Sequence, residues 1–348
     1  MAYTTVNKSS DYFNTKLYTG NGSTNAITGV GFQPDMCWWK MRSGTEEHAL
    51  GDAVRGAGYI VKPNSTDAQA QSASYFASFD SDGFTLGSDT KTNGNSSTYA
   101  SWNWKANGVG SSNTDGSITT TVSANTTAGF SIVKWTAGSG VSGIGHGLGV
   151  VPKLIICKDL SASSAWTVGS DLLNDWGGYL GLQSSSGLNS ETRMYKPSGY
   201  SSPTASLFYQ DHSAFGSAGE NMIAYCFAEK QGFSKFGSYT GNGNADNAFI
   251  YTGFKPAWIM TKKTVGSGYH WFVFDNKRDG YNNSNKRFEA SSTAIEADTS
   301  PAGNIDILSN GFKIRTTDGH IADAGEYLYI AFASAPLVGS NNVPCTAR

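Results

Sequence analysis

The chain has 348 residues, a formal net charge of −2 and only 15% charged residues, but 18 Phe, 17 Tyr, 9 Trp and 42 Gly. This length exceeds one ordinary core, and the mixture of aromatic and turn-forming residues predicts an all-β protein. The low net charge argues against nucleic-acid binding, and no apolar run approaches the roughly 20 residues that would insert into a membrane. Met1–Lys8 lacks the apolar stretch of a secretory signal, so we expect synthesis in a cytoplasm.

Three segments along the chain share one sequence pattern: a turn that begins with an aromatic residue, then a Pro, then an apolar run that ends in Lys. The Pro and Lys landmarks are Pro34 with Lys40, Pro152 with Lys158, and Pro256 with Lys262. Each Lys follows its Pro by six positions. An aromatic residue precedes each Pro by sixteen or seventeen positions: Tyr18, Trp135 and Tyr239. Such constant spacing indicates an internal repeat.

Each of the three copies also ends in a similar run of aromatic and small or apolar residues. These closing runs are 99–104, 222–227 and 327–332, and their last aromatic residue follows the Pro of the copy by 70, 75 and 76 positions. Asp82-Gly83 and Asn310-Gly311 precede similar alternating runs and are strong turn signals. We therefore predict three related β-sandwich domains in tandem, of a jelly-roll or lectin-like type.

The predicted boundaries are 1–108 for the first repeat, 130–232 for the second and 233–348 for the third, which includes a C-terminal tail. Residues 109–129, rich in Ser, Thr, Gly and Asn, are predicted to be a linker with one short strand. The apolar run after each Pro predicts a buried central strand with the Pro at its start. Ser65 to Ser74 is the best candidate for a short helix.

No residue pattern predicts a catalytic or metal site. Cys37, Cys157, Cys226 and Cys345 are at least about 70 residues apart, so no CxxC pair exists, and the first three are expected to be buried thiols. The histidines show no metal-binding spacing and are expected to be structural or exposed: His48, His146, His212, His270 and His320. His146 is expected in a turn before a strand.

Catalysis on glycans would need two carboxylates that flank one bond. The candidates are scattered and do not recur across the copies in a way that marks a site: Glu46, Glu47, Asp52, Asp80, Asp82 and Glu191. Asp52 to Gly56 and Asp275 to Gly280 lie at similar places in two copies, which favours a structural salt bridge. There is no phosphate-binding loop, nucleophile elbow or calcium loop, so we expect no cofactor and no metal.

Aromatic residues leave two interpretations open, since exposed rings stack on sugars and buried rings pack cores or subunit interfaces. Trp38 and Trp39 are adjacent, so on a strand they face opposite ways and one could point outward. Trp166, Trp176, Tyr195 and Tyr200 lie in looser segments of the second copy.

Several motifs together resemble a repeat domain of marine bacteriophage virion proteins. They are 18–22, 29–35, 52–56, 79–84, 102–105, 145–149, 224–229 and the final Ala347-Arg348. The resemblance runs from about residue 12 to residue 348. It implies a structural or tail-fibre-like role on lectin-like β domains, and it brings no catalytic residues.

The resulting hypothesis is a non-enzymatic virion structural protein, most simply a tail-associated fibre or host-adhesion component. We expect its partners to be other virion proteins, further copies of itself and a host surface glycan or receptor, with no nucleic acid. The alternatives are a capsid decoration protein on the head surface, favoured by the absence of a long anchor before the first repeat, and a glycan-cleaving tailspike enzyme, supported only by the scattered carboxylates.

Overall fold

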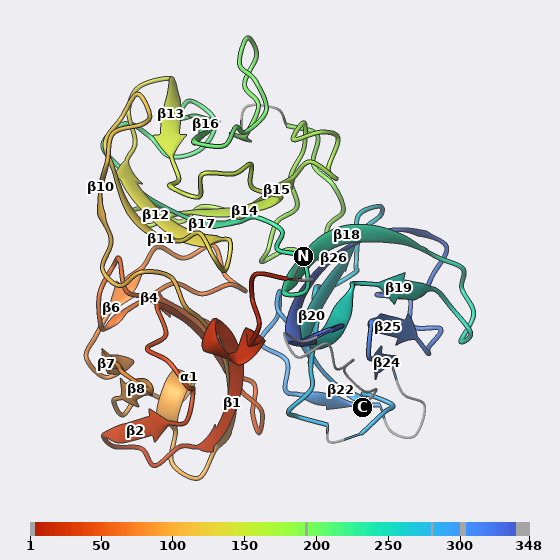
Figure 1. Ribbon diagram of the computed structural model, residues 1–348. Coiled ribbons are helices and arrows are strands. Elements are labelled where there is room, and N and C mark those ends of the chain that lie inside the picture. Colours follow the sequence, from red (N-terminus) through yellow and green to blue (C-terminus); the bar gives the residue numbers. More distant parts are fainter. Residues whose placement is uncertain (1–3, 192–193, 280, 300–303, 339–348) are drawn as a thin grey trace.

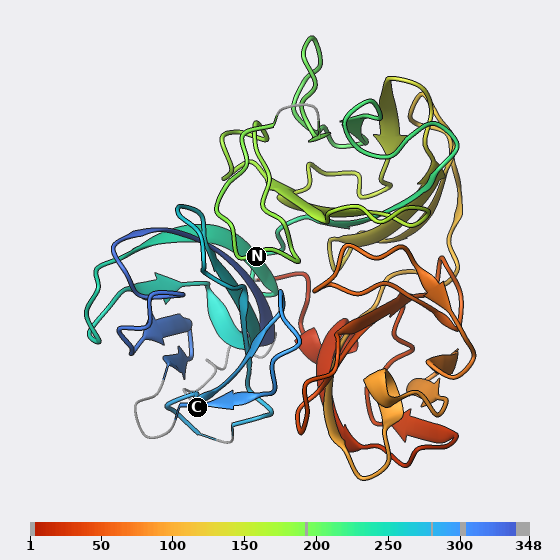
Figure 2. The same cartoon turned by 180° about the vertical axis from the view of Figure 1, so that it is seen from behind.

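The computed structural model describes residues 4–191, 194–279, 281–299 and 304–338 and is all-β, with several antiparallel sheets. Three lobes surround a common centre (Figure 1). We call them the first lobe (β1–β9), the second lobe (β10–β17) and the third lobe (β18–β26). Seen from behind, the lobes keep the same arrangement (Figure 2). Helical structure in the described residues is limited to short pieces, among them one α-helix of four residues and one 3-10 turn of three residues.

The first lobe begins with the 3-10 turn η1 (Ser9–Asp11) and contains α1 (Thr90–Asn93). Its main sheet has the order β1-β9-β3-β4; the small sheet β2-β8-β7 packs against one face of it, and the pair β5-β6 adjoins the β4 edge through the bridge between Leu50 and Val61. The strands are β1 Phe13–Thr19, β2 Asn25–Thr28, β3 Met36–Met41, β4 Ala49–Asp52, β5 Tyr59–Ile60, β6 Ala70–Gln71, β7 Phe76–Asp80, β8 Gly83–Leu86 and β9 Thr98–Trp104.

The second lobe has a main sheet of order β10-β11-β12-β17-β14-β15 and an outer pair, β13-β16. The strands are β10 Ser111–Asn113, β11 Thr120–Asn125, β12 Phe130–Thr136, β13 Val141–Gly145, β14 Leu154–Asp159, β15 Thr167–Ser170, β16 Leu207–Asp211 and β17 Asn221–Phe227. Residues 109–129 thus hold two strands where the sequence predicted one within a linker, because β11 pairs along β12 and β10 pairs along β11.

The third lobe has a main sheet of order β18-β26-β20-β21-β22-β23 and an outer sheet, β19-β25-β24. The strands are β18 Ser234–Gly241, β19 Phe249–Tyr251, β20 Phe254–Lys263, β21 Phe272–Asp275, β22 Lys286–Glu289, β23 Ala297–Asp298, β24 Ile305–Leu308, β25 Gly311–Ile314 and β26 Gly325–Pro336. The N-terminal segment reaches this lobe, since the Thr4 hydroxyl donates to the carbonyl of Gln231 at 2.5 Å.

Four strands occur in the same order in each main sheet: β1-β9-β3-β4, β12-β17-β14-β15 and β18-β26-β20-β21. The registers also agree. Met36 pairs with Trp104, Leu154 with Phe227, and Trp258 with Phe332. These pairs join the second residue after each Pro to the last aromatic of each closing run.

The runs that follow Pro34, Pro152 and Pro256 lie in central strands, as the sequence predicted. All residues of β3 and β14 are buried. Pro256 lies inside β20 at a shift of register against β26, where a missing N–H does the least harm to the ladder.

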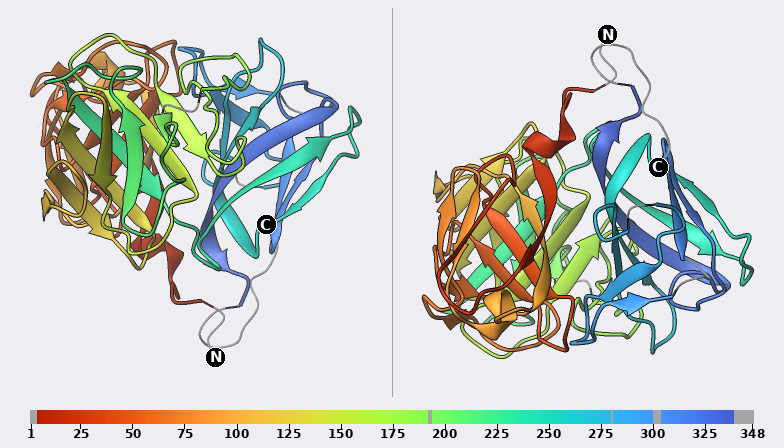
Figure 3. Two further views of the ribbon diagram at one scale, coloured as in Figure 1. Left: turned by 90° about the horizontal axis from the view of Figure 1, so that it is seen from above. Right: turned by 90° about the horizontal axis from the view of Figure 1, so that it is seen from below.

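One face of each main sheet packs into a central core shared by the lobes. Trp104 and Trp258 meet edge to face there with ring centroids 5.6 Å apart, and Phe13 stacks on Phe332 at 5.3 Å. The views from above and below show the third lobe beside the first and second lobes, which overlap in these views (Figure 3). The first and second lobes also have cores of their own on the opposite face, whereas the third lobe's interior is continuous with the central core.

The predicted helix at Ser65 to Ser74 is wrong. This segment contains turns and the two-residue strand β6. The amide of Asp67 is held by the Ser65 hydroxyl, and the amide of Gln69 donates to Leu160 of the second lobe. A polar segment without an apolar face gains more from these bonds than from a helical turn.

Candidate binding surfaces and the seams between the lobes

The predicted chemistry-bearing residues are distributed through the fold. The five histidines do not converge: His48, His146 and His212 are buried, while His270 and His320 stack on each other in the third lobe at 5.8 Å. His146 follows β13 in a turn and its Nε2 faces the Thr204 carbonyl at 3.1 Å. Across the described ranges, no group of three or more His, Cys, Asp or Glu side chains is placed to hold a metal ion.

Three cysteines are buried free thiols, as predicted: Cys37, Cys157 and Cys226. Burial raises the pKa of each, that of Cys157 to about 12, so these sulfurs stay protonated and are poor nucleophiles. Cys345 lies outside the described residues.

The scattered carboxylates stabilise local structure. Asp82 accepts from the amides of Gly29 and Gly31, and Asp80 accepts from two hydroxyls on its own hairpin. Glu47 pairs with Lys62 at 2.8 Å, and Glu46 accepts from the Thr90 hydroxyl. Glu191 also has an interaction partner. These contacts are typical of turns and caps.

Most of the singled-out aromatics are buried. Trp38 and Trp39 face opposite sides of β3, but one side is the central core and the other is the first lobe's own core, so neither is a surface platform. Trp166, Trp176 and Tyr195 are also buried, while Tyr200 is exposed and packs against Tyr209 with ring centroids 5.1 Å apart.

The three lysines that follow the prolines join the lobes in a ring. Each Nζ donates to the carbonyl of the next residue in its own strand or turn and to one carbonyl of a neighbouring lobe. The neighbours' acceptors are Thr293 for Lys40 at 3.2 Å, Thr66 for Lys158 at 3.2 Å and Ser185 for Lys262 at 3.4 Å. Every seam between two lobes therefore contains one such lysine.

Burial lowers the pKa of these three lysines to about 8 in each case. The charges near the three lysines differ. Glu46 favours the charged form of Lys40 and Asp159 favours that of Lys158, whereas Lys263 disfavours the charged form of Lys262. A buried ammonium is tolerated here because carbonyl oxygens replace its water shell.

A second ring of contacts runs through the backbone, two residues beyond each lysine. The carbonyls of Arg42, Leu160 and Thr264 accept from amides of the neighbouring lobe. The donors are Glu296 at 3.4 Å, Gln69 at 3.0 Å and Leu188 at 2.6 Å. Each donor lies three positions after the carbonyl that receives the lysine, so the same turn of each neighbour supplies both contacts.

A third ring involves the residue just before β4, β15 and β21. These residues, His48, Trp166 and Trp271, direct a ring nitrogen at a neighbour's carbonyl, which belongs to Glu289, Lys62 and Gly181 respectively. Trp38 Nε1 donates to His48 Nδ1 at 2.9 Å, so Nε2 of the neutral ring carries the proton. Burial and the Lys40 charge lower the pKa of His48 well below its ordinary value.

The predicted salt bridges at Asp52 and Asp275 exist and are buried. Arg55 Nε binds Asp52 at 2.5 Å, and Arg278 Nε binds Asp275 at 2.6 Å. Both reach across a seam, because Asp52 accepts from the hydroxyl of Tyr225 in the second lobe at 2.8 Å.

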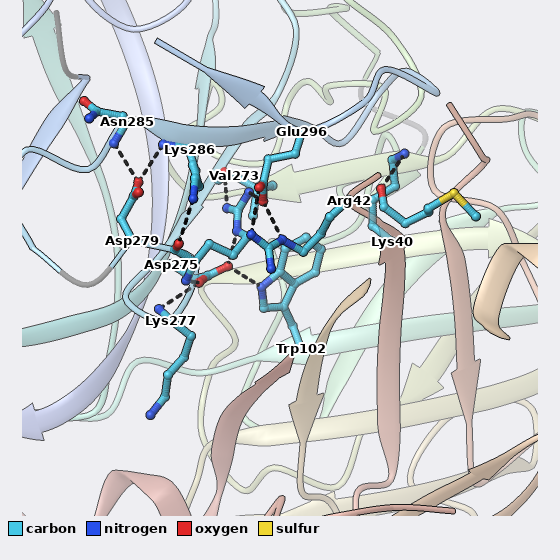
Figure 4. A network of polar contacts seen from close by, with 12 residues as sticks. Lys40, Arg42, Trp102, Val273, Asp275, Lys277, Asp279, Asn285, Lys286 and Glu296 are labelled. Carbon is cyan, nitrogen blue, oxygen red and sulfur yellow. Dashed lines mark hydrogen bonds and ion pairs between the residues drawn. The ribbon is translucent and has the colours of Figure 1, made fainter. Parts of the chain in front are cut away.

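Figure 4 shows the second of these networks, where Asp275 of the third lobe accepts from Trp102 Nε1 of the first lobe at 3.0 Å. Glu296 joins Arg278 to Arg42 of the first lobe. Burial alone would raise the pKa of the Asp275 carboxyl, but the Arg278 charge and the hydrogen bonds from Trp102 and Arg278 hold it below its ordinary value.

The second lobe lacks this ion pair. Ser170 pairs with Leu154 as Asp52 pairs with Met36, so Ser170 and Leu173 stand where the other lobes have Asp and Arg. By the same registers, Ile330 of the third lobe corresponds to Trp102 and Tyr225. An apolar side chain offers no donor to a carboxylate, so an uncharged pair, Ser170 and Leu173, is the less costly solution at this seam.

The third lobe carries an exposed aromatic strand. Phe249 and Tyr251 alternate with buried Ile250 on β19 and are 46% and 54% exposed. On the neighbouring strand, Phe249 is paired with Lys313, which binds Asp246 at 2.7 Å. The outward residues of β2 in the first lobe are Ala26 and Thr28, so this surface distinguishes the third lobe.

A polar hollow of about 320 Å³ adjoins Tyr251. Its lining includes Glu229, Gln231 and Lys235, and Glu229 binds Lys235 at 2.7 Å. An aromatic ring beside hydrogen-bonding side chains is the combination that saccharides require. By contrast, the void at the centre of the molecule holds about 20 Å³ among aromatic and aliphatic side chains, room for one water molecule at most.

Sequence reasoning recognised the three lysines as landmarks but not as contacts between lobes. Their recurrence at the end of an otherwise apolar run was the available signal, because a buried charge must be compensated. The exposed strand at 249–251 was missed as well. Its Phe-Ile-Tyr alternation has no counterpart in the first copy, and that difference could have revealed it.

Fold and seams together define an all-β protein of three interlocked lobes. A domain family of unknown function, DUF7483, matches residues 8–336, and the chain belongs to this family. No curated protein and no solved structure matches it. Over the described ranges, none of the helices is both long and apolar enough to cross a membrane.

Proposed function

We propose that the protein is a non-enzymatic structural component of a bacteriophage virion, tail-associated, which contacts the host surface. The observation that carries this proposal is the ring of seam contacts, repeated at all three junctions by lysine, backbone and ring N–H donors. Such a closed, cross-braced scaffold suits a mechanical role. The resemblance of the repeat motifs to marine phage virion proteins supplies the biological setting.

We further propose that the lobes are three β-sandwich domains derived from one ancestor, with the predicted boundaries 1–108, 130–232 and 233–348. The common strand order and equivalent registers support this origin. Superposition of the lobes tests this origin: the three four-strand sheets should superpose together with their outer sheets, and unrelated outer layers would contradict a common sandwich.

The adhesive part of the proposal rests on Phe249, Tyr251 and the polar hollow beside Tyr251. A host surface glycan fits this chemistry, because sugar rings stack on exposed aromatic faces while their hydroxyls bond to nearby polar groups. We expect Tyr251→Ala to abolish binding on an array of host envelope glycans, and Val109→Ala, at a 74% exposed site in the second lobe, to leave it intact. Equal glycan binding by both variants would show that Tyr251 does not contact the glycan.

Copy number in purified particles tests the virion role. Tens of copies or fewer per particle fit a tail component, and hundreds would instead indicate a capsid decoration protein. Absence from purified particles would refute a virion role. Release of reducing ends from host envelope glycans by the purified protein would overturn its assignment as a non-enzyme.

A further inference from the structure

The exposed strand β19 and the polar hollow beside it form one continuous surface, because Tyr251 belongs to both. Phe249 and Tyr251 point outward from the same face of the strand, with the buried Ile250 between them, so their Cα atoms are roughly 7 Å apart. Thr252 and Gly253 follow Tyr251 along the chain and line the hollow. A ligand that extends along β19 from Phe249 to Tyr251 therefore reaches the hollow next.

The ring of Phe249 leans over the neighbouring strand. Its Cε2 atom is 3.2 Å from the position that a Cβ at Gly311 would occupy, so the missing side chain of this glycine makes room for the ring. Phe249 and Tyr251 remain 46% and 54% exposed, which leaves aromatic surface open to a ligand at both positions. The spacing of the two rings along the strand is comparable to the length of one sugar unit, so neighbouring units of one glycan chain can contact both.

The charges around this surface are balanced. Three basic and three acidic side chains line the hollow or lie at the Phe249 end of β19, and each basic side chain is bound to an acidic one. The pairs are Lys235 with Glu229 at 2.7 Å, Lys313 with Asp246 at 2.7 Å and Arg315 with Asp306 at 2.6 Å. Among these six side chains no charge lacks a counter-charge, so an acidic or amino sugar gains no net attraction here.

The ion pair in the hollow matches the hydroxyl groups of an uncharged sugar. The side chains of Lys235 and Glu229 are 37% and 29% exposed, so both charged groups are accessible from the hollow. A sugar hydroxyl both donates and accepts hydrogen bonds, as a Ser or Thr hydroxyl does. Of two adjacent hydroxyls, one can therefore donate to the Glu229 carboxylate while the other accepts from the Lys235 ammonium.

We propose that this surface binds the interior of a linear, uncharged polysaccharide. One sugar unit stacks on Phe249, the next stacks on Tyr251, and hydroxyls of the following unit bind Glu229 and Lys235 in the hollow. This inference rests on the proposed adhesive function and adds to it the charge of the glycan and the part of the glycan that is bound. A terminal sugar by itself would occupy only one of these positions.

The charge of the ligand is tested by sorting the glycans that the full chain binds on an array of host envelope glycans. The bound glycans should be uncharged. Their affinity should change by less than about twofold between roughly 10 mM and roughly 1 M NaCl, because matched charges contribute no net attraction that salt could screen. Binding confined to acidic or amino sugars would overturn the inference and leave the adhesive function in place. Binding to no glycan would overturn both.

The length of the site is tested with size-fractionated fragments of a bound glycan. Titration calorimetry should show affinity that rises up to about three sugar units and then levels off, as three contact positions require. Phe249→Ala should weaken binding of the three-unit fragment about tenfold. Thr28→Ala is the matched control, because Thr28 pairs with Gly83 on the first lobe's outer sheet as Tyr251 pairs with Gly311. Full affinity for a single sugar, or equal affinities of the two variants, would refute binding of a chain interior.

The role of the ion pair is tested by Glu229→Gln, which leaves the charge of Lys235 unmatched. This variant should gain salt-sensitive binding to alginate, a polymer of uronic acids, which the unaltered chain should not bind. Without that gain, the pair does not select uncharged sugars and the inference fails. Purified particles should bind the same glycan as the isolated chain does. Loss of binding in particles would mean that another virion protein covers β19, which would also overturn the site.

Discussion

Two seams differ in the residue pair that is buried at equivalent positions. They are the seam between the third and first lobes and the seam between the second and third lobes. At the first of these, Asp275 and Arg278 are buried against Trp102, whose ring N–H donates to the carboxylate. At the second, Ser170 and Leu173 occupy the equivalent positions and Ile330 stands in place of Trp102. The contrast teaches that the residue facing the pair decides whether a buried charge can be kept, because only a polar partner compensates its desolvation.

Removing half of the ion pair should have the largest effect. Asp275→Ala leaves the buried Arg278 with Glu296, at 3.3 Å, as its remaining carboxylate partner and removes the acceptor of Trp102, which we expect to cost about 3 kcal/mol or more of unfolding free energy. The matched change Ser170→Ala at the other seam should cost only about 1 kcal/mol. Denaturant titration of both variants measures the difference in unfolding free energy, and equal costs would mean that the ion pair and the uncharged pair contribute equally to stability.

Replacing a buried ion pair by the residues of the second lobe should restore most of the unfolding free energy that is lost when one charge is removed. Arg55→Leu alone leaves Asp52 unpaired and should cost about 3 kcal/mol. Adding Asp52→Ser and Tyr225→Phe recreates the uncharged Ser and Leu pair of the second lobe and should recover about 2 kcal/mol. The readout is again denaturant unfolding, and a triple variant no more stable than Arg55→Leu would show that the replacement cannot pack.

The lysine common to all seams should produce a pH dependence. The folded-state pKa of Lys262 is lowered to about 8 from an ordinary 10.5 by burial and Lys263, so the unfolded chain binds more protons between these values. Its contribution to stability therefore rises with pH, by about 2 kcal/mol from pH 8 to pH 10. Lys262→Met should lose this rise, measured as the difference from wild type in unfolding at each pH.

Lys277→Met, which alters an exposed lysine, should keep the rise and serves as the control. If Lys262→Met follows the wild-type pH profile, the Lys262 ammonium is not desolvated at the seam between the second and third lobes.

The ring N–H contacts should have the smallest effect. Trp271→Phe removes the donor to the Gly181 carbonyl at the seam between the second and third lobes. Trp258→Phe removes a buried N–H that has no partner in the described residues. Thermal or denaturant unfolding should find Trp271→Phe the more costly by about 1 kcal/mol, the net value of one hydrogen bond. Equal losses of unfolding free energy in the two variants would mean that Trp271 stabilises the seam by packing and not by its hydrogen bond.

The sequence by itself determined the all-β class, the buried strands after Pro34, Pro152 and Pro256, and the Asp–Arg pairs. These features are local, since alternation, turn residues and an i, i+3 charge pair are readable within a few positions of each other. The helix predicted at Ser65 to Ser74 was wrong because part of its backbone bonds to a distant lobe: the Gln69 amide donates to Leu160, and the Thr66 carbonyl accepts from Ser164.

Only the tertiary structure decided which neighbour each lobe contacts. Lys40 meets Thr293 across 253 positions, and Asp275 meets Trp102 across 173. No local pattern encodes such distances, because they depend on how the sheets close around the central core. The same closure decided that β11 covers the edge of β12, while among the described residues β18 has a partner strand on one side only.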